Sequence, residues 1–253
     1  MPRSRPRCPW WSPLGGHDAP VTDSAAPLVA DQLAALAAEQ DGFAALATTA
    51  GLDAPVPACA PWTVADLVRH LTAVHRWAAA TARLGADAAV PDDEPSDRAA
   101  TVEDYRTAAA GLRAALADPT RPCPTLAGPG LVAWWRRRQL HETFVHRLDL
   151  AEALGIPLAA DPEVAADCIA EVVDTVQPRQ VRLGRMPAPT TGLRFTTPTA
   201  SWALGPAPVA EVAGPDVAVA QLLWRRTTLA DPRLVVSGDR AGAATLLAQP
   251  LTP

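Results

Sequence analysis

Residues 131–154, LVAWWRRRQLHETFVHRLDLAEAL, decide the fold of this chain. The stretch predicts one long helix that ends at Gly155, because glycine commonly follows the last turn of a helix. Each residue advances about 100° around the helix axis. One side of the helix is therefore an apolar stripe, made of Leu140, Phe144, Leu148 and Ala151. A helix with such a stripe packs against other helices, which indicates a helical bundle.

The polar side of the same helix carries the candidate chemistry. Glu142 and His146 are four residues apart, so both side chains project from one face and can meet at one point. A carboxylate and an imidazole at this spacing are a pair by which a helix presents two ligands to one metal ion. Such pairs are also common on solvated helix faces, so the spacing alone does not establish a metal site. The whole polar band comprises Trp135, Arg138, Gln139, Glu142, His146 and Asp149.

Other parts of the chain predict the helices that complete the bundle. Apolar residues at a three-to-four spacing predict the first helix. Thr63 with Asp66, and Thr101 with Asp104, give the T-x-x-D signal at which a second and a third helix begin. The expected helices cover residues 27–50, 64–83, 101–118 and 162–176, and residues 119–130 are expected only to end the third.

The second helix supplies the remaining candidate ligands, His70 and His75. They are five residues apart, which turns one about 140° away from the other, so only one of them can join Glu142 and His146. His70 lies at the border of an apolar stripe, and His75 lies nearer its middle. A histidine in such a stripe is more often a hydrogen-bonded core residue than a ligand. The phase of the helix favours neither histidine strongly.

Beyond Gln177 the pattern changes from helical to mixed. Leu193 and Phe195 alternate with Arg194 and Thr196, as expected of a strand with one buried face. Further short strands near 200–204, 208–212 and 233–237 surround one helix at 215–226 and predict a small α+β domain. The expected division is a disordered extension at 1–26, a helical-bundle domain at 27–178, a linker at 179–191 and the α+β domain at 192–253.

The composition excludes several classes of function. A net charge of −5 and a pI near 5.5 argue against a protein that binds nucleic acid through its overall field, although WWRRR at 134–138 combines aromatic and basic residues. No apolar run reaches the roughly 20 residues of a membrane-spanning helix, and the N-terminus lacks the apolar stretch of a signal peptide. We therefore expect a cytoplasmic protein that binds neither nucleic acid nor membrane.

The cysteines form no recognisable motif. Cys8, Cys59, Cys123 and Cys168 lie far apart in the sequence, and no two of them make a C-x-x-C pair. A redox motif and a zinc ribbon are thus excluded. The expectation is four reduced thiols that pack as small core residues.

Two stretches together resemble a known family. They are PWTVADLVRHLTAVHRWAAA at 61–80 and RRRQLHETFVHRLDLAEALG at 136–155. They are similar to the mycothiol-dependent maleylpyruvate isomerase family, whose N-terminal domain is an all-α, metal-binding four-helix bundle like that of the DinB and YfiT-like proteins. The resemblance implies that His70, Glu142 and His146 hold zinc or another divalent ion. His75 is then left as a supporting or core residue.

The resemblance extends less sharply into residues 213–247, which look like the family's small C-terminal α+β domain. There a helix ends in a Leu-Leu-Trp-Gly-Arg-like string. Arg225 stands here in place of the usual glycine, and Arg226 matches an arginine that the family implies in contact with a carboxylate-bearing substrate or thiol. Arg226 is accordingly a candidate catalytic residue.

The activity implied by the resemblance uses mycothiol, a low-molecular-weight thiol, as co-substrate at the metal. It is the cis-trans isomerisation of a small electrophile such as maleylpyruvate, or S-transfer to one, in an actinobacterial cytoplasm. Arg138 is a second candidate catalytic residue that would neutralise a substrate carboxylate, or it forms a plain ion pair with Glu142 one turn away. The alternative is a non-catalytic metal-binding or regulatory module. The sequence allows a monomer or a homodimer.

Overall fold

The computed structural model describes residues 28–89 and 101–253. These residues fall into two compact units, one built from residues 36–155 and the other from residues 156–252 together with the segment before residue 36. The expected disordered extension at 1–26 lies outside the described residues. Within them, no helix is long and apolar enough to cross a bilayer.

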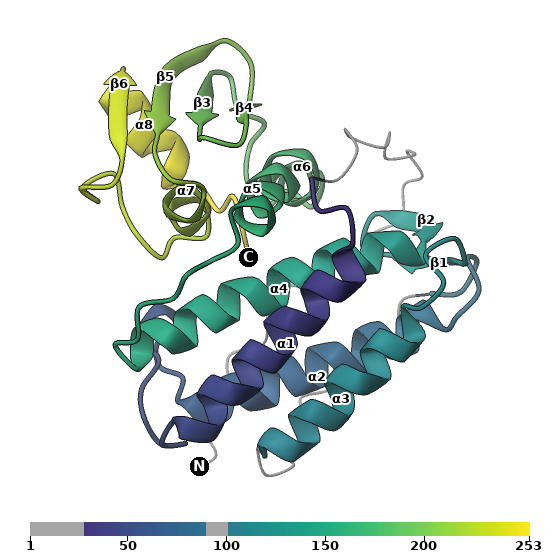
Figure 1. Cartoon of the computed structure of the whole chain (residues 1–253). Coiled ribbons are helices and arrows are strands. Elements are labelled where there is room, and N and C mark those ends of the chain that lie inside the picture. The colour runs from purple at the N-terminus through teal and green to yellow at the C-terminus, as the bar shows by residue number, and fades with distance from the viewer. Residues whose placement is uncertain (1–27, 90–100) are drawn as a thin grey trace, which may run out of the picture. The chain divides into compact units, whose positions relative to one another are not determined.

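The first unit is a bundle of four helices that lie alongside one another (Figure 1). They share one buried apolar cluster, to which α1 contributes Phe43, α2 Leu67, α3 Tyr105 and α4 Leu150. The all-α bundle predicted from the sequence is confirmed. Its helices are α1 (Gln32–Thr49), α2 (Val64–Ala82), α3 (Val102–Ala115) and α4 (Val132–Ala153), with a single 3₁₀ turn, η1 (Pro57–Cys59), ahead of α2.

Helix α2 begins where the sequence predicts. The Thr63 hydroxyl accepts a hydrogen bond from the backbone N–H of Asp66, and the Asp66 carboxylate accepts one from the backbone N–H of Thr63. This reciprocal capping box satisfies two N–H groups that the first turn otherwise leaves unpaired. Thr101 caps α3 through the backbone N–H of Asp104 at 3.0 Å. The starting points of α2 and α3 are thus fixed by local chemistry.

A short hairpin, β1 (Pro122–Thr125) with β2 (Gly128–Leu131), precedes α4. The sequence predicts only a helix end here, because proline and glycine obscure the alternation that marks a strand. The indole N–H of Trp135 donates to the carbonyl of Pro124 at 2.8 Å. This bond fastens the hairpin to the first turn of α4.

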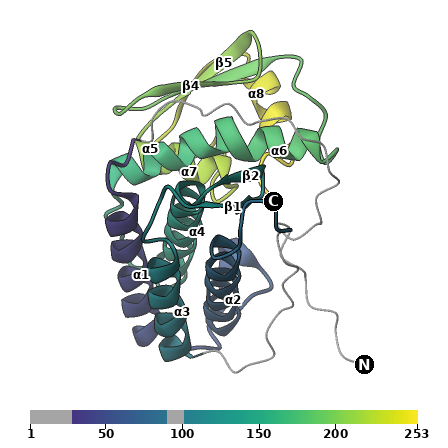
Figure 2. The ribbon, with the colours of Figure 1, turned by 90° about the vertical axis from the view of Figure 1, so that its right-hand side faces the viewer.

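The second unit opens with a helix that runs through a proline. It consists of α5 (Pro162–Glu171), the π-helical turn η2 (Val172–Val176) and α6 (Gln177–Arg182), drawn as one continuous run in Figure 2. Pro178 lacks an N–H and is expected to break a helix. Here it lies two residues after the end of the π turn, where the hydrogen-bond register has already shifted. The segment expected to be a linker at 179–191 therefore begins inside α6.

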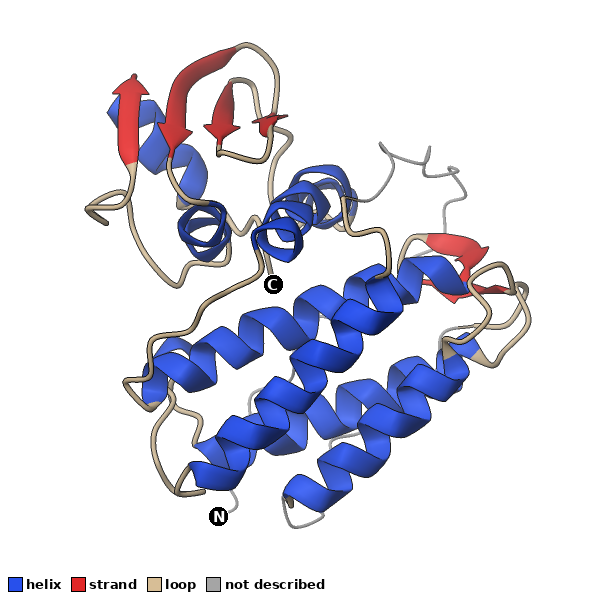
Figure 3. Ribbon diagram, viewed as in Figure 1, coloured by secondary structure: helices blue, strands red, loops and turns tan. Residues whose placement is uncertain are grey.

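The rest of the second unit is the predicted α+β domain. Its sheet has the order β4-β3-β5-β6, with β3 parallel to β5 and the other neighbours antiparallel (Figure 3). Helix α5 packs against α7, so 162–176 groups with this sheet and the chain divides after Gly155 rather than at residue 178. The elements are β3 (Gly192–Thr196), β4 (Ser201–Leu204), β5 (Pro208–Ala213), α7 (Asp216–Leu223), β6 (Val235–Gly238) and an unpredicted α8 (Arg240–Leu247).

Candidate metal centre

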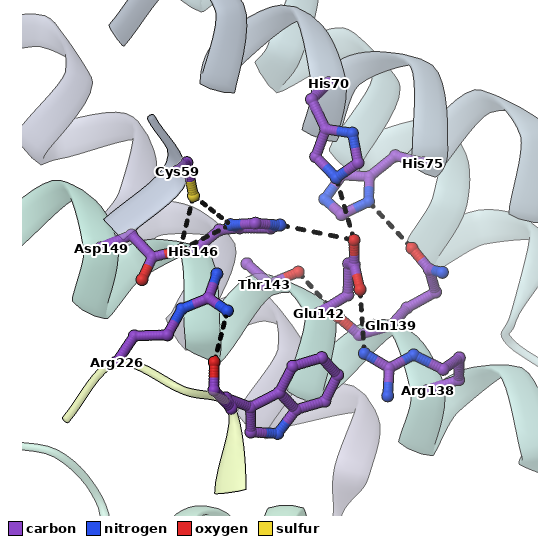
Figure 4. Close-up of polar contacts among 11 residues, drawn as sticks. Cys59, His70, His75, Arg138, Gln139, Glu142, Thr143, His146, Asp149 and Arg226 are labelled. Atoms are coloured by element: carbon purple, nitrogen blue, oxygen red, sulfur yellow. Dashed lines mark hydrogen bonds and ion pairs between the residues drawn. The ribbon is translucent and has the colours of Figure 1, made fainter. Parts of the chain in front are cut away.

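Helices α2 and α4 bring His70, Glu142 and His146 together (Figure 4). Oε1 of Glu142 lies 3.0 Å from Nε2 of His70 and 3.5 Å from Nε2 of His146. The three side chains are 8%, 5% and 11% exposed, so little solvent reaches the group. These are the three residues that the sequence resemblance implied as metal ligands.

The spacing of the three ligand atoms fits a single metal ion. Two donors on a tetrahedral metal, each at about 2.1 Å, lie about 3.4 Å from one another. The distances of 3.0 and 3.5 Å fall on either side of that value, and all three atoms lie within 4.8 Å of one another. Two imidazoles and one carboxylate are a donor set that zinc and several other divalent first-row ions accept.

His75 points away from this group. Its Nδ1 donates to the amide oxygen of Gln139 at 3.1 Å, and its ring lies 5.5 Å from the ring of Tyr105, centroid to centroid. The side chain is fully buried, and burial lowers its pKa to about 4. His75 is therefore a neutral core residue, and of the two histidines on α2 only His70 faces Glu142.

Arg138 forms the ion pair that was one of its two expected roles. Its Nη2 donates to Oε2 of Glu142 at 2.9 Å, and both side chains are buried. Burial alone raises the pKa of Glu142. Hydrogen bonds from His146 and His70 and the charge of Arg138 outweigh it and hold that pKa well below its ordinary value. Glu142 is thus ionised, with its second oxygen turned toward the histidines.

The other edge of His146 meets an acid and a thiol. Nδ1 of His146 lies 2.9 Å from Oδ2 of Asp149, and Sγ of Cys59 lies 3.2 Å from that same oxygen. Burial lowers the pKa of His146, but the bond to Asp149, followed by Cys59 and Glu142, raises it well above the usual range. Cys123 and Cys168 are buried core residues, as expected. Cys59 was expected among them, yet it lies half-buried at the site, where no local motif signals it.

Trp62 covers the two histidines. Its ring centroid lies 5.0 Å from that of His70 and 6.4 Å from that of His146. The segment that carries Cys59 and Trp62 is pinned by backbone hydrogen bonds at 2.9 Å, from Val56 N to the Trp62 carbonyl and from Val64 N to the Ala54 carbonyl. One tethered loop therefore places both the thiol and the indole.

Two family models match this chain. The model of the mycothiol maleylpyruvate isomerase N-terminal domain matches residues 33–151, and that of the MDMPI C-terminal domain matches residues 163–245. The chain belongs to the mycothiol-dependent maleylpyruvate isomerase family. The expected resemblance and the expectation of an isomerase-like enzyme are thereby confirmed. The gap between the two matches contains the point at which the structure divides the chain.

Solved structures agree with this fold. A crystal structure of the mycothiol-dependent maleylpyruvate isomerase superposes with a TM-score of 0.60 at 14% identity, over 84% of this chain and 93% of that one. A histidine-to-alanine mutant of the same isomerase gives 0.58 at 13% identity, over 78% and 88%. A sequence search among curated proteins gives no match.

Helix α7 is followed by Arg225, which stands in place of the family's usual glycine. Arg225 adopts a φ of +63°, the left-handed conformation that glycine adopts most easily. Its N–H donates to the Leu222 carbonyl at 3.0 Å, and the N–H of Arg226 donates to the Gln221 carbonyl at 2.8 Å. This is a complete Schellman motif, in which Arg225 occupies the left-handed position that glycine usually takes. Nη1 of Arg226 donates to the Trp224 carbonyl at 2.7 Å within the same unit.

Proposed function

We propose that this chain is a metal-dependent enzyme that uses mycothiol as co-substrate to isomerise a small electrophile or to transfer the thiol to it. The convergence of His70, Glu142 and His146 between α2 and α4 carries the proposal. Membership in the mycothiol-dependent maleylpyruvate isomerase family supplies the thiol and the reaction class. We place the activity in the cytoplasm, where low-molecular-weight thiols stay reduced.

The three residues would hold zinc or another divalent ion, which lowers the pKa of a thiol bound at its open position so that the thiolate forms near neutral pH. The protein's own groups prepare that position. Arg138 keeps Glu142 ionised and oriented by the 2.9 Å ion pair, so it acts through Glu142. Trp62 shields both imidazoles and limits the access of water, which strengthens every charge interaction at the site.

The isomerisation itself needs only a nucleophile that leaves again. The thiolate would add to the activated double bond of the electrophile to give an enolate, the resulting single bond would rotate, and loss of the thiolate would restore the double bond in the trans form. S-transfer would stop after the addition step, once the enolate takes up a proton from solvent. Arg226, which matches the family's arginine, is proposed to bind a carboxylate of the substrate or of the thiol and so to orient the reactants.

A metal assay with matched variants tests the proposal. Wild-type protein purified without chelator is expected to hold about one equivalent of metal, and His70→Ala and Glu142→Ala are expected to weaken zinc binding more than 100-fold, since each removes a ligand. His75→Gln is the control, because it alters a buried histidine of the same helix that lies outside the ligand group.

Turnover separates an enzyme from a metal-binding module. Mycothiol-dependent conversion of maleylpyruvate or of a test electrophile is expected from wild type and lost in both ligand variants. If the metal-loaded protein binds no mycothiol and the ligand variants change only stability, a regulatory or storage role replaces the enzymatic one.

A further inference from the structure

Both ring nitrogens of His146 make polar contacts with neighbouring side chains. Nε2 faces Glu142 and His70, while Nδ1 faces Asp149 at 2.9 Å (Figure 4). An ionised carboxylate only accepts hydrogen bonds, so a proton must sit on Nδ1 for this contact to form. The contact therefore selects which nitrogen of the neutral ring keeps its proton and which offers a lone pair.

Asp149 itself is anchored by a second donor. The thiol of Cys59 donates to the same Oδ2 at 3.2 Å, and the Asp149 side chain is fully buried. Asp149 sits three residues after His146 on α4, whereas Cys59 belongs to η1. The carboxylate is thus restrained by its own helix and by a separate segment of the chain.

We infer that Asp149, backed by Cys59, is a positioning residue that fixes the ring of His146 with its proton on Nδ1 and presents Nε2 between His70 and Glu142. A ring with the opposite tautomer carries its proton on Nε2 and has no lone pair there for a ligand. An acid behind a metal-binding histidine both orients the ring and raises its basicity. As regards metal binding, the inference rests on the proposed function.

Zinc affinity measured by competition with a chelator tests the inference. Asp149→Ala is expected to lower affinity about 10-fold to 100-fold, the usual effect of removing such an acid. Asp149→Asn keeps an oxygen that can accept from Nδ1 and is expected to lose less. Cys59→Ser keeps a donor and is expected to stay near wild type, and Cys59→Ala is expected to lose less than about fivefold, because a thiol is a weak donor.

Glu39→Gln is the matched control. Glu39 is a buried acid that bonds to Arg147, the residue next to His146, so its replacement disturbs the same helix without touching the ligand group. Its zinc affinity is expected to equal that of wild type. If Asp149→Ala and Asp149→Asn both bind zinc within about twofold of wild type, the inference is overturned.

A second readout needs no metal. Long-range ¹H–¹⁵N spectra of the metal-free protein are expected to show a protected, downfield proton on Nδ1 of His146 that disappears in Asp149→Ala and persists in Glu39→Gln. Absence of that proton in wild type overturns the inference. Failure of wild type to bind zinc overturns the proposed function instead, and the Nδ1 signal still decides the role of Asp149.

Discussion

Helix α4 carries two buried clusters of charged side chains, one at His146 and one at Arg147. They differ in how hydrogen-bond donors and acceptors are paired. Arg147 meets Glu39 of α1 through two parallel bonds, Nε to Oε2 at 2.5 Å and Nη2 to Oε1 at 2.8 Å. At His146 the pairing is not one-to-one, because a single oxygen of Glu142 faces an imidazole nitrogen of His70 and another of His146. Both clusters are buried, and each contains a glutamate paired with an arginine. Convergence of several ligand atoms on one point is what distinguishes the candidate metal centre from the structural ion pair.

The Arg147–Glu39 pair joins α4 to α1 and is closely packed. Gly42 lies directly beneath Arg147, and a Cβ at residue 42 would come within 3.0 Å of its Cδ and Nη1. The absence of a side chain at Gly42 leaves room for Arg147 to reach Glu39. A bidentate pair of this kind fastens α1 to α4.

At neutral pH the largest effect on stability should come from breaking the Arg147–Glu39 ion pair. Glu39→Gln leaves the Arg147 guanidinium buried without its counter-charge, so we expect the free energy of unfolding to fall by about 3 kcal/mol. Urea denaturation monitored by circular dichroism measures this change. Glu142→Gln should show a different profile, because it also leaves a buried arginine, Arg138, without its counter-charge but in addition causes a strong loss of zinc binding. Equal profiles for the two variants would remove the distinction between the clusters.

A second prediction concerns His75, the histidine beside the ligand group but outside it. Its pKa is about 4 in the folded chain and about 6.5 when unfolded, so only the unfolded state takes up a proton between these values. Stability should therefore be fully present above pH 6.5 and fall by about 3 kcal/mol as the pH drops toward 4.

His75→Gln should flatten this pH dependence, because glutamine carries no titrating group. Denaturation midpoints of metal-free wild type and variant, compared at intervals between pH 7 and pH 4, check the expectation. Parallel curves for the two proteins would show that His75 is not the residue that titrates.

The smallest effect is expected at Arg225, a charged residue outside both clusters. Arg225→Gly should stabilise the C-terminal unit by about 1 kcal/mol, because glycine adopts a φ of +63° without the strain of a Cβ. Scanning calorimetry that resolves the transition of this unit measures the gain. Arg225→Ala is the control and should give no comparable gain, since alanine keeps the Cβ.

The sequence predicts best where the chemistry is local. The capping signal at Thr63 and Asp66 places the start of α2, and the spacing of Glu142 and His146 places them on one face of α4. Helix phase could not choose between His70 and His75, because the choice depends on how α2 rotates against α4. The family resemblance selected His70, and the bond from His75 to Gln139 shows where the other ring goes instead.

Contacts between residues far apart in the chain could not be predicted from the sequence. Cys59 meets Asp149 across 90 positions of the chain, and no pattern around either residue signals that meeting. The helix at 162–176 was expected to give way to a linker at 179–191, but a π turn precedes Pro178 and the chain stays helical to Arg182. Helix α8 is eight residues long and too short for periodicity to mark it.

The tethered loop before α2 has a consequence for how such proteins diversify. Cys59, Trp62 and His70 come from one contiguous stretch, and the bonds from Val56 to Trp62 and from Val64 to Ala54 hold it to the start of the helix. A single genetic exchange of this short segment would replace every site residue that comes from it, while Glu142 and His146 of α4 stay unchanged. Relatives could acquire new substrates by such grafts without rebuilding the bundle.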